Sequence, residues 1–331
     1  NNNERVIIVF DTSGSMKNFL PNGIRKVDAG ISAMSQLVTD NSSIDFGLMR
    51  FKNDNGGYIM AGLGSPHSTI LSQIHSLPAA GSTPVTETLW EAYLYLTGQK
   101  VYYGQNSNER DFSAETGSLY YDNNSRYISP FTQAVGADVR CDNSINLILM
   151  TDGDPQSDTN RNDDIKSLYK STFGSNPSKT SNSYLAALAQ IIHGTRDVEV
   201  DLYDTTPEVA DTGRVFTIGF GSGMSTNGKK LLEKTALLGG GEYLHADTST
   251  ELSEALNNTI SKIREVNDSF SSPTVASNNV DQTRSRESIY FAMFYPETGA
   301  RWSGNLKKLK VSGANIVDST DQIALDENGL I

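Results

Sequence analysis

Acidic and hydroxyl-bearing side chains directly follow two apolar runs of this sequence. Residues 6–10 run into the pattern D-x-S-x-S, residues 145–150 run into T-D-G, and a third polar segment, G-S-T-P, lies between them in the chain. Two carboxylates and three hydroxyls, without a nitrogen or sulfur ligand, form a set of hard oxygen donors. Such a set suits Mg²⁺, Mn²⁺ or Ca²⁺ and disfavours zinc and copper. The candidate metal ligands are Asp11, Ser13, Ser15, Thr83 and Asp152.

The elements that must bring these side chains together are visible as apolar patterns. Three runs are nearly continuous rather than alternating, which is typical of strands covered by helices on both faces: residues 6–10, 145–150 and 215–220. Apolar residues spaced three and four apart predict helices over residues 24–38, 83–96 and 251–263. The alternation predicts an α/β fold with a doubly wound, mostly parallel sheet over residues 4–265. Loops after flanking strands share a crevice in such a sheet, so Asp11 and Asp152 are expected to face each other.

The chain of 331 residues is longer than one average domain, and its residue pattern changes near residue 266. We expect an α/β domain over residues 1–265, with insertions at about 99–143 and 194–213. Residues 266–331 alternate in short runs between polar turns, which predicts a small β-rich extension. In the second insertion three apolar residues alternate with acids and predict a protruding hairpin: Val198, Val200 and Leu202.

Composition excludes several classes of protein. The 39 acidic and 27 basic residues give a net charge of −12, which argues against nucleic acid as a partner, because phosphate contacts need a basic face. The longest unbroken apolar stretch, residues 289–295, is far shorter than a membrane-spanning helix, so no membrane-spanning segment is expected. The single cysteine, Cys141, excludes an internal disulfide framework and is expected to be a buried thiol.

The spacing of the candidate ligands resembles the metal-ion-dependent adhesion site (MIDAS) of von Willebrand factor A domains. Asp11-Thr-Ser-Gly-Ser15, Thr83 and Thr151-Asp152-Gly153 match the three loops of that family in the same order. The resemblance implies a Rossmann-like fold and one divalent cation at these residues, with Mg²⁺ favoured over Ca²⁺ or Mn²⁺. A coordination position left open would take a carboxylate from a protein partner.

Further segments resemble the N-terminal half of the type IV pilus tip adhesins of the PilY/PilC family. The matching segments are residues 83–98, 127–130, 147–155, 237–249 and 301–307, the last of which reads RWSGNLK. The resemblance implies attachment to a host or abiotic surface, pilus assembly and twitching motility. It also implies minor pilins as partners and an extracellular location at the pilus tip. Family members continue into a C-terminal β-propeller, so the sequence is expected to be an N-terminal fragment.

Two other functions fit parts of the sequence. An intracellular A domain that acts as a substrate adaptor for an ATPase complex would use the same ligands, but RWSGNLK favours the pilus family. An aspartyl-phosphate phosphotransferase would need a second acid two residues after Asp11, where this chain has Ser13. No general base or placed nucleophile accompanies the site, so no catalytic activity is expected.

Residues 158–169 have part of the spacing of a calcium-binding loop. However, Asp163 stands where that loop needs glycine, and Tyr169 where it needs a bidentate glutamate. The segment is therefore expected to be a polar loop.

Overall fold

The chain divides into two units, Asn1–Ser261 and Lys262–Ile331. The computed structural model describes residues 4–117, 124–132, 143–203, 210–268, 288–295, 303–312 and 315–317. Helix α7 (Ser249–Asp268) runs across the division, so the boundary expected after residue 265 lies inside a continuous helix. Cys141 and residues 301 and 302 lie outside the described residues.

A six-stranded sheet forms the centre of the first unit. Its order is β3-β2-β1-β4-β5-β6, with every neighbouring pair parallel except β2 and β3. The strands are β1 (Arg5–Phe10), β2 (Asp45–Phe51), β3 (Gly57–Ala61), β4 (Asn143–Thr151), β5 (Asp211–Phe220) and β6 (Gly240–Ala246). The doubly wound, mostly parallel α/β class expected from the sequence is confirmed.

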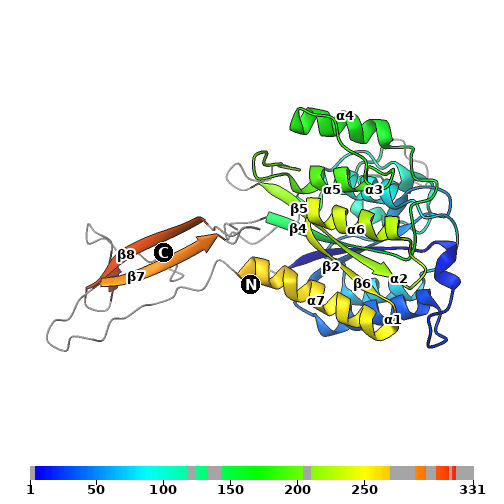
Figure 1. The fold of residues 1–331 in the computed structure, drawn as a ribbon, viewed down its shortest axis with the longest axis horizontal. Helices are drawn as coiled ribbons and strands as arrows, with labels where there is room; N and C mark the ends of the chain where they lie inside the picture. Colours follow the sequence, from blue (N-terminus) through cyan, green and yellow to red (C-terminus); the bar gives the residue numbers. More distant parts are fainter. Residues whose placement is uncertain are drawn as a thin grey trace. The chain divides into compact units, whose positions relative to one another are not determined.

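Strands β1 and β4 lie in the middle of this sheet because their side chains are apolar on both faces. Every residue of both strands is buried, and β-branched Val and Ile side chains pack well on a pleated surface. Helices cover both faces, as continuous apolar strands require. Figure 1 shows α3, α4, α5 and α6 on one side of the sheet and α1 and α7 on the other.

The α-helices are α1 (Lys26–Asp40), α2 (His67–His75), α3 (Val85–Leu96), α4 (Asn162–Phe173), α5 (Leu185–His193), α6 (Thr226–Leu238) and α7. Helix α1 begins after Ile24, which is 43% exposed, so the predicted apolar stripe starts at Val27. Helix α3 begins at Val85 with Pro84 as its N-cap, two residues later than the predicted start at residue 83. At the start of α7, Glu251 N–H donates to Thr248 Oγ1, while the Glu251 carboxylate accepts from Asp247 N–H, one residue before the N-cap position of a capping box.

Short 3₁₀ helices lie in the loops: η1 (Gly14–Lys17), η2 (Tyr103–Asn106), η3 (Phe112–Ala114) and η4 (Pro130–Thr132). The last three belong to the first insertion. The second insertion is described at residues 194–203 and 210–213. Its strand residues there are Asp211–Gly213, the start of β5, so the alternating residues 198–202 do not form the predicted hairpin strand. Val200 is buried and Leu202 packs against the core, because apolar side chains in this segment find a partner surface on the domain itself.

The second unit contains a small antiparallel sheet in the order β7-β8-β9. Its strands are β7 (Ser288–Tyr295), β8 (Ser303–Ser312) and β9 (Asn315–Val317). The β-rich character expected of this region is thus present. Among the described residues, no helix combines the length and the apolar character needed to cross a membrane.

Candidate metal centre

The carboxyl ends of β1 and β4 meet where the path of the chain through the sheet reverses. Strands β2 and β3 extend from β1 in one direction, and β5 and β6 extend from β4 in the other. Phe10, the last residue of β1, is in register with Met150, next to the end of β4. Ligands of open α/β sheets bind in the crevice at such a switch point. Both predicted aspartates follow directly after these strands.

Asp11 is the most deeply placed of the candidate ligands and is fully buried. Its Oδ1 accepts a hydrogen bond from Ser13 N–H at 2.7 Å, and its Oδ2 accepts from Thr151 Oγ1 at 2.6 Å and from Asp152 N–H at 3.2 Å. Burial, together with the negative charge of Asp152, raises the pKa of Asp11 to about 6, although the hydrogen bonds from Ser13 and Thr151 oppose the shift. The carboxylate is thus fixed by both loops, in surroundings that favour a nearby positive charge.

The hydroxyls of the first loop link the two aspartates. Ser13 Oγ lies 3.0 Å from Ser15 Oγ, and Ser15 Oγ donates to Asp152 Oδ1 at 2.6 Å. Ser13 and Asp152 are almost fully buried, whereas Ser15 is partly exposed. The alternate side chains of the D-x-S-x-S loop therefore converge with the carboxylate after β4, as the spacing predicts.

A close contact between backbones fixes the third loop against the first. Gly14 N–H donates to the Gly81 carbonyl at 2.9 Å. Gly81 has φ +97°, and a Cβ atom there would lie 2.2 Å from the Asn53 carbonyl oxygen. Glycine is needed at this position because a side chain would clash and the backbone is left-handed.

Thr83 is 5% exposed and lies at the same cavity as the other hydroxyls. Its carbonyl accepts from Gln156 N–H at 3.0 Å, which ties it to the loop that carries Asp152. The cavity has a volume of about 310 Å³, and four of the five predicted ligands line it: Ser13, Ser15, Thr83 and Asp152. Asp11 is bonded to two of these four residues and lies buried beside them. The structure brings all five together, and their role as metal ligands stays a prediction.

The first turn of α3 is capped by a side chain from a distant loop rather than by Thr83. Asp158 Oδ2 accepts from Thr86 N–H and Oδ1 accepts from Glu87 N–H, both at 2.8 Å. Burial raises the pKa of Asp158 to about 7, against the effect of these bonds. The calcium-loop spacing does not form a site, because Asp158 caps α3 while residues from Asn162 onward belong to α4.

Lys26 is a site residue that the sequence did not reveal. Its Nζ lies 2.8 Å from Asp152 Oδ2, and its side chain is only 8% exposed. Gly221 gives it room, since a Cβ atom there would lie 2.7 Å from Lys26 Cε. No local pattern signals this pair, because Lys26 and Asp152 are 126 residues apart in the chain. The ammonium group of Lys26 therefore places one positive charge next to Asp152, a carboxylate that is also a candidate metal ligand.

The donor set fits a hard divalent cation. Two carboxylates, Asp152 and Asp154, and three hydroxyls line the cavity, and Asp11 is buried beside it. Neither imidazole nor thiol is among its lining residues in the described structure. The described residues hold no cluster of three or more His, Cys, Asp or Glu side chains. Any metal site here must therefore depend on hydroxyl oxygens, as the candidate set does.

Known proteins resemble this chain in structure but not in sequence. No known protein-family model matches the chain, and no curated protein matches it. BatB, a conserved hypothetical protein from Bacteroides thetaiotaomicron, is 16% identical, with 78% of this chain and 98% of that chain covered at a TM-score of 0.41. The von Willebrand factor domain of Mfa5, a type V pili tip protein from Porphyromonas gingivalis, is 13% identical, with 78% and 94% covered at 0.41.

Proximal thread matrix protein 1 from the mussel byssus, solved with a zinc-occupied MIDAS motif, is a third similar structure. It is 14% identical, with 78% of this chain and 48% of that chain covered at a TM-score of 0.40, so the match spans about half of its length. At these identities and TM-scores the likenesses concern the fold alone, and what each protein binds is a property of that protein.

Proposed function

We propose that this chain is a metal-ion-dependent adhesion module that captures a carboxylate-bearing partner at the end of β1 and β4. The observation that carries the proposal is that four oxygen-bearing side chains from three separate loops line one cavity at the switch point of the sheet, with the Asp11 carboxylate bonded to two of those residues. Two carboxylates within reach of one another repel, and the single charge of Lys26, which pairs with Asp152, offsets this only in part. A cation between them would remove that cost.

Asp11, Ser13, Ser15, Thr83 and Asp152 would hold the ion, with Mg²⁺ as the favoured occupant. When bound, the ion supplies a Lewis-acidic position for an oxygen of the partner's carboxylate. The chain's own residues orient that partner: the cavity of about 310 Å³ admits a short acidic side chain, and Asn18 and Gln156 line its mouth as hydrogen-bonding groups. The module binds and does not turn over a substrate, since Lys26, the nitrogen base of the cavity, is held by Asp152.

The finer part of the proposal assigns the module to the tip of a type IV pilus. There it would act outside the cell in attachment, pilus assembly and twitching motility, with minor pilins as its neighbours. The segments that resemble the PilY/PilC family support this assignment, above all RWSGNLK in residues 301–307, which lies beyond the α/β domain. In the source organism, loss of twitching on deletion and its rescue by the intact gene would support the assignment. Normal piliation and twitching without the gene would contradict it.

Calorimetric titration with Mg²⁺ tests the metal site directly. We expect one ion per chain in the wild type and no binding in Asp11→Ala, with circular dichroism showing that the variant stays folded. Asp163→Ala is the matched control, because Asp163 is an exposed acid on α4, outside the cavity. Wild-type affinity in Asp11→Ala would refute the assignment. A second titration, with an aspartate-containing peptide and its asparagine counterpart in the presence of Mg²⁺, tests the carboxylate specificity.

A further inference from the structure

A short hairpin between η1 and α1 begins and ends at the candidate metal cavity. Asn18 and Lys26, the residues at its two ends, both line the cavity, and Lys26 N–H donates to the Asn18 carbonyl at 2.9 Å. Between them, Phe19 and Arg25 form an antiparallel bridge. We call residues 19–25 the rim hairpin. It lies next to the opening through which the carboxylate of the proposed partner would reach the metal.

Hydrogen bonds and one buried side chain brace the rim hairpin. Leu20 N–H donates to the Ile24 carbonyl at 2.8 Å, and Gly23 N–H donates to the Leu20 carbonyl at 2.9 Å. Asn22 accepts from Ile24 N–H at 3.1 Å, and its Nδ2 donates to Ser249 Oγ at 3.1 Å, which ties the turn to the start of α7. Leu20 is 4% exposed and anchors the hairpin in the domain. The backbone is therefore organised before a partner arrives, which lowers the entropy cost of binding.

The rim hairpin presents apolar side chains to solvent. Phe19 is 69% exposed and Ile24 is 43% exposed. Six large apolar side chains are exposed in the described part of the chain, and two of the six lie in this one short segment. Exposed apolar residues that are scattered singly are ordinary, whereas several beside a polar cavity indicate contact with another molecule. Phenylalanine is also among the residues that are enriched at the centre of protein interfaces.

The charges around the rim hairpin complement an acidic partner. Residues 17–26 contain three basic residues and no acidic one, although the chain as a whole carries a net charge of −12. Arg25 and Lys26 are paired with acids of the domain itself, whereas Lys17 is exposed at the start of the segment. Opposite charges across an interface speed association and fix the orientation of the partner. A partner that brings a carboxylate to the metal therefore meets a favourable surface here.

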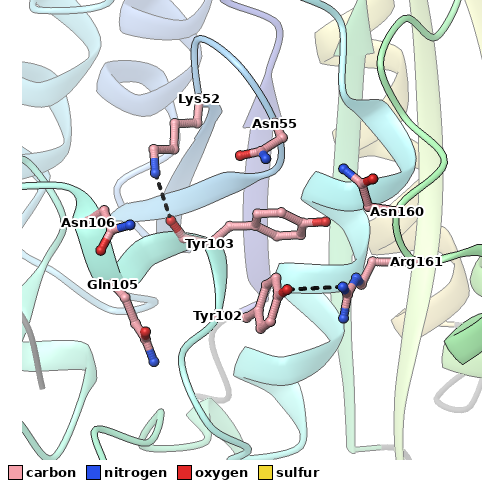
Figure 2. A pocket seen from close by; sticks show the side chains of 8 residues that line it. All are labelled: Lys52, Asn55, Tyr102, Tyr103, Gln105, Asn106, Asn160 and Arg161. Carbon is pink, nitrogen blue, oxygen red and sulfur yellow. Dashed lines mark hydrogen bonds between the residues drawn. The ribbon is translucent and has the colours of Figure 1, made fainter. Parts of the chain in front are cut away.

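A partner bound at the metal must also contact the surface around the cavity, because a stable interface buries about 800 Å² of each protein. The domain has a second hollow, of about 500 Å³ (Figure 2). Its lining contains no aliphatic side chain and shares no residue with the metal cavity. Arg161 Nη2 donates to Tyr102 Oη at 3.0 Å there, and Lys52 Nζ donates to the Tyr103 carbonyl at 3.4 Å. The rim hairpin is thus the better place for an apolar contact.

We propose that the rim hairpin binds an apolar side chain of the protein partner, close to the acidic residue that the metal captures. This inference rests on the proposed function, because it adds a second contact for the same partner. The partner is then a protein in which a leucine, isoleucine, methionine or phenylalanine lies near the captured acid. Phe19 is the principal contact, since it is the most exposed large apolar side chain of the described residues, and Ile24 extends the contact.

A displayed peptide library, with one fixed aspartate between randomised residues, tests the proposal by selection on the wild-type chain in Mg²⁺. We expect the selected peptides to carry apolar residues near the aspartate. They should bind Phe19→Ser about tenfold more weakly, because a phenylalanine side chain is no longer buried on binding. Phe19→Leu should keep most of the affinity. Leu237→Ser is the matched control, because Leu237 is 65% exposed on α6, outside the metal cavity.

The outcomes separate the rim contact from the metal site. Calorimetry with Mg²⁺ should give wild-type affinity for Phe19→Ser, so a loss of peptide binding in this variant reports the hairpin alone. Peptides that need Mg²⁺ but bind Phe19→Ser as tightly as the wild type would overturn the rim contact and leave the metal site standing. An equal loss in Leu237→Ser would also overturn it. Absence of any peptide whose binding needs both Mg²⁺ and the aspartate would overturn the proposed function, and the rim contact with it.

Discussion

Replacing Lys26 by methionine should strengthen metal binding while it weakens the metal-free fold. The substitution removes the ammonium group but keeps an unbranched apolar stem of similar length. In the wild type that group lies 2.8 Å from Asp152 Oδ2, with both side chains nearly inaccessible to water. Without it the buried carboxylate of Asp152, next to Asp11, loses its compensating partner. A divalent ion would then be the only positive charge at the site.

The magnitude follows from the burial of this pair. Removal of one partner of a buried ion pair costs about 3–5 kcal/mol, so the apo variant should melt about 6–20 °C below the wild type. The hydrogen bond between charged groups contributes about 1.5–3 kcal/mol. The metal no longer competes with that bond, so its affinity should rise about tenfold to a hundredfold. Repulsion between the ammonium group and the ion acts in the same direction.

Calorimetry with Mg²⁺ and thermal melts with and without the ion measure both effects. Lys17→Met is the matched control, because Lys17 is an exposed lysine on η1, next to the same loop. We expect its affinity and melting temperature to match the wild type. If Lys26→Met stays folded and binds Mg²⁺ equally or more weakly, the reasoning is refuted, and Lys26 instead positions Asp152 for the ion.

Three further substitutions test how the loops are fixed. Glu91→Gln should lower the free energy of unfolding by about 2–4 kcal/mol, measured by denaturant titration. The reason is that the buried carboxylate accepts hydrogen bonds from three backbone N–H groups and from the Tyr127 hydroxyl. An unchanged free energy would contradict this. Asp158 keeps its proton up to about pH 7 in the folded chain but only to about pH 4 when unfolded, so its contribution to stability should fall as pH rises between these values. Melts from pH 4 to 8 should therefore show a shallower decline in Asp158→Asn than in the wild type, and parallel curves would exclude the shift. Gly81→Ala should weaken Mg²⁺ binding and lower the melting temperature, because its Cβ would meet the Asn53 carbonyl; wild-type values of both would refute that account.

The central strands and the candidate ligands could be predicted from the sequence because both are encoded in contiguous residues. Residues 6–10 are apolar throughout and residues 145–150 are apolar except for Asn146, and a strand covered on both faces buries such a run. The D-x-S-x-S pattern places alternate side chains on one side of a loop. Since the loop follows a strand at the switch point, the position of Asp11 relative to Asp152 follows from the topology.

Other elements carry weaker signals. Strand β6 (Gly240–Ala246) is half-exposed along most of its length, and β3 (Gly57–Ala61) is short and antiparallel at the opposite edge. The apolar run of β3 is only four residues long, and β6 alternates between polar and apolar residues, so the sequence pattern did not reveal either strand. The alternation over residues 198–202 predicted a hairpin, but its apolar side chains pack on the core instead. Pattern alone cannot tell which surface an apolar residue covers.

The partners of buried charged groups were decided by the tertiary structure alone. Lys26 pairs with Asp152, and Asp158 caps a helix that begins more than seventy residues earlier in the chain. In the sequence, Glu87 and Glu91 look like ordinary acidic residues of a helix. In the structure their carboxylates accept backbone N–H hydrogen bonds from loops in three parts of the sequence. The physical reason is that local spacing fixes which face of an element a residue occupies. Which distant donors meet a buried carboxylate depends instead on how whole elements pack together.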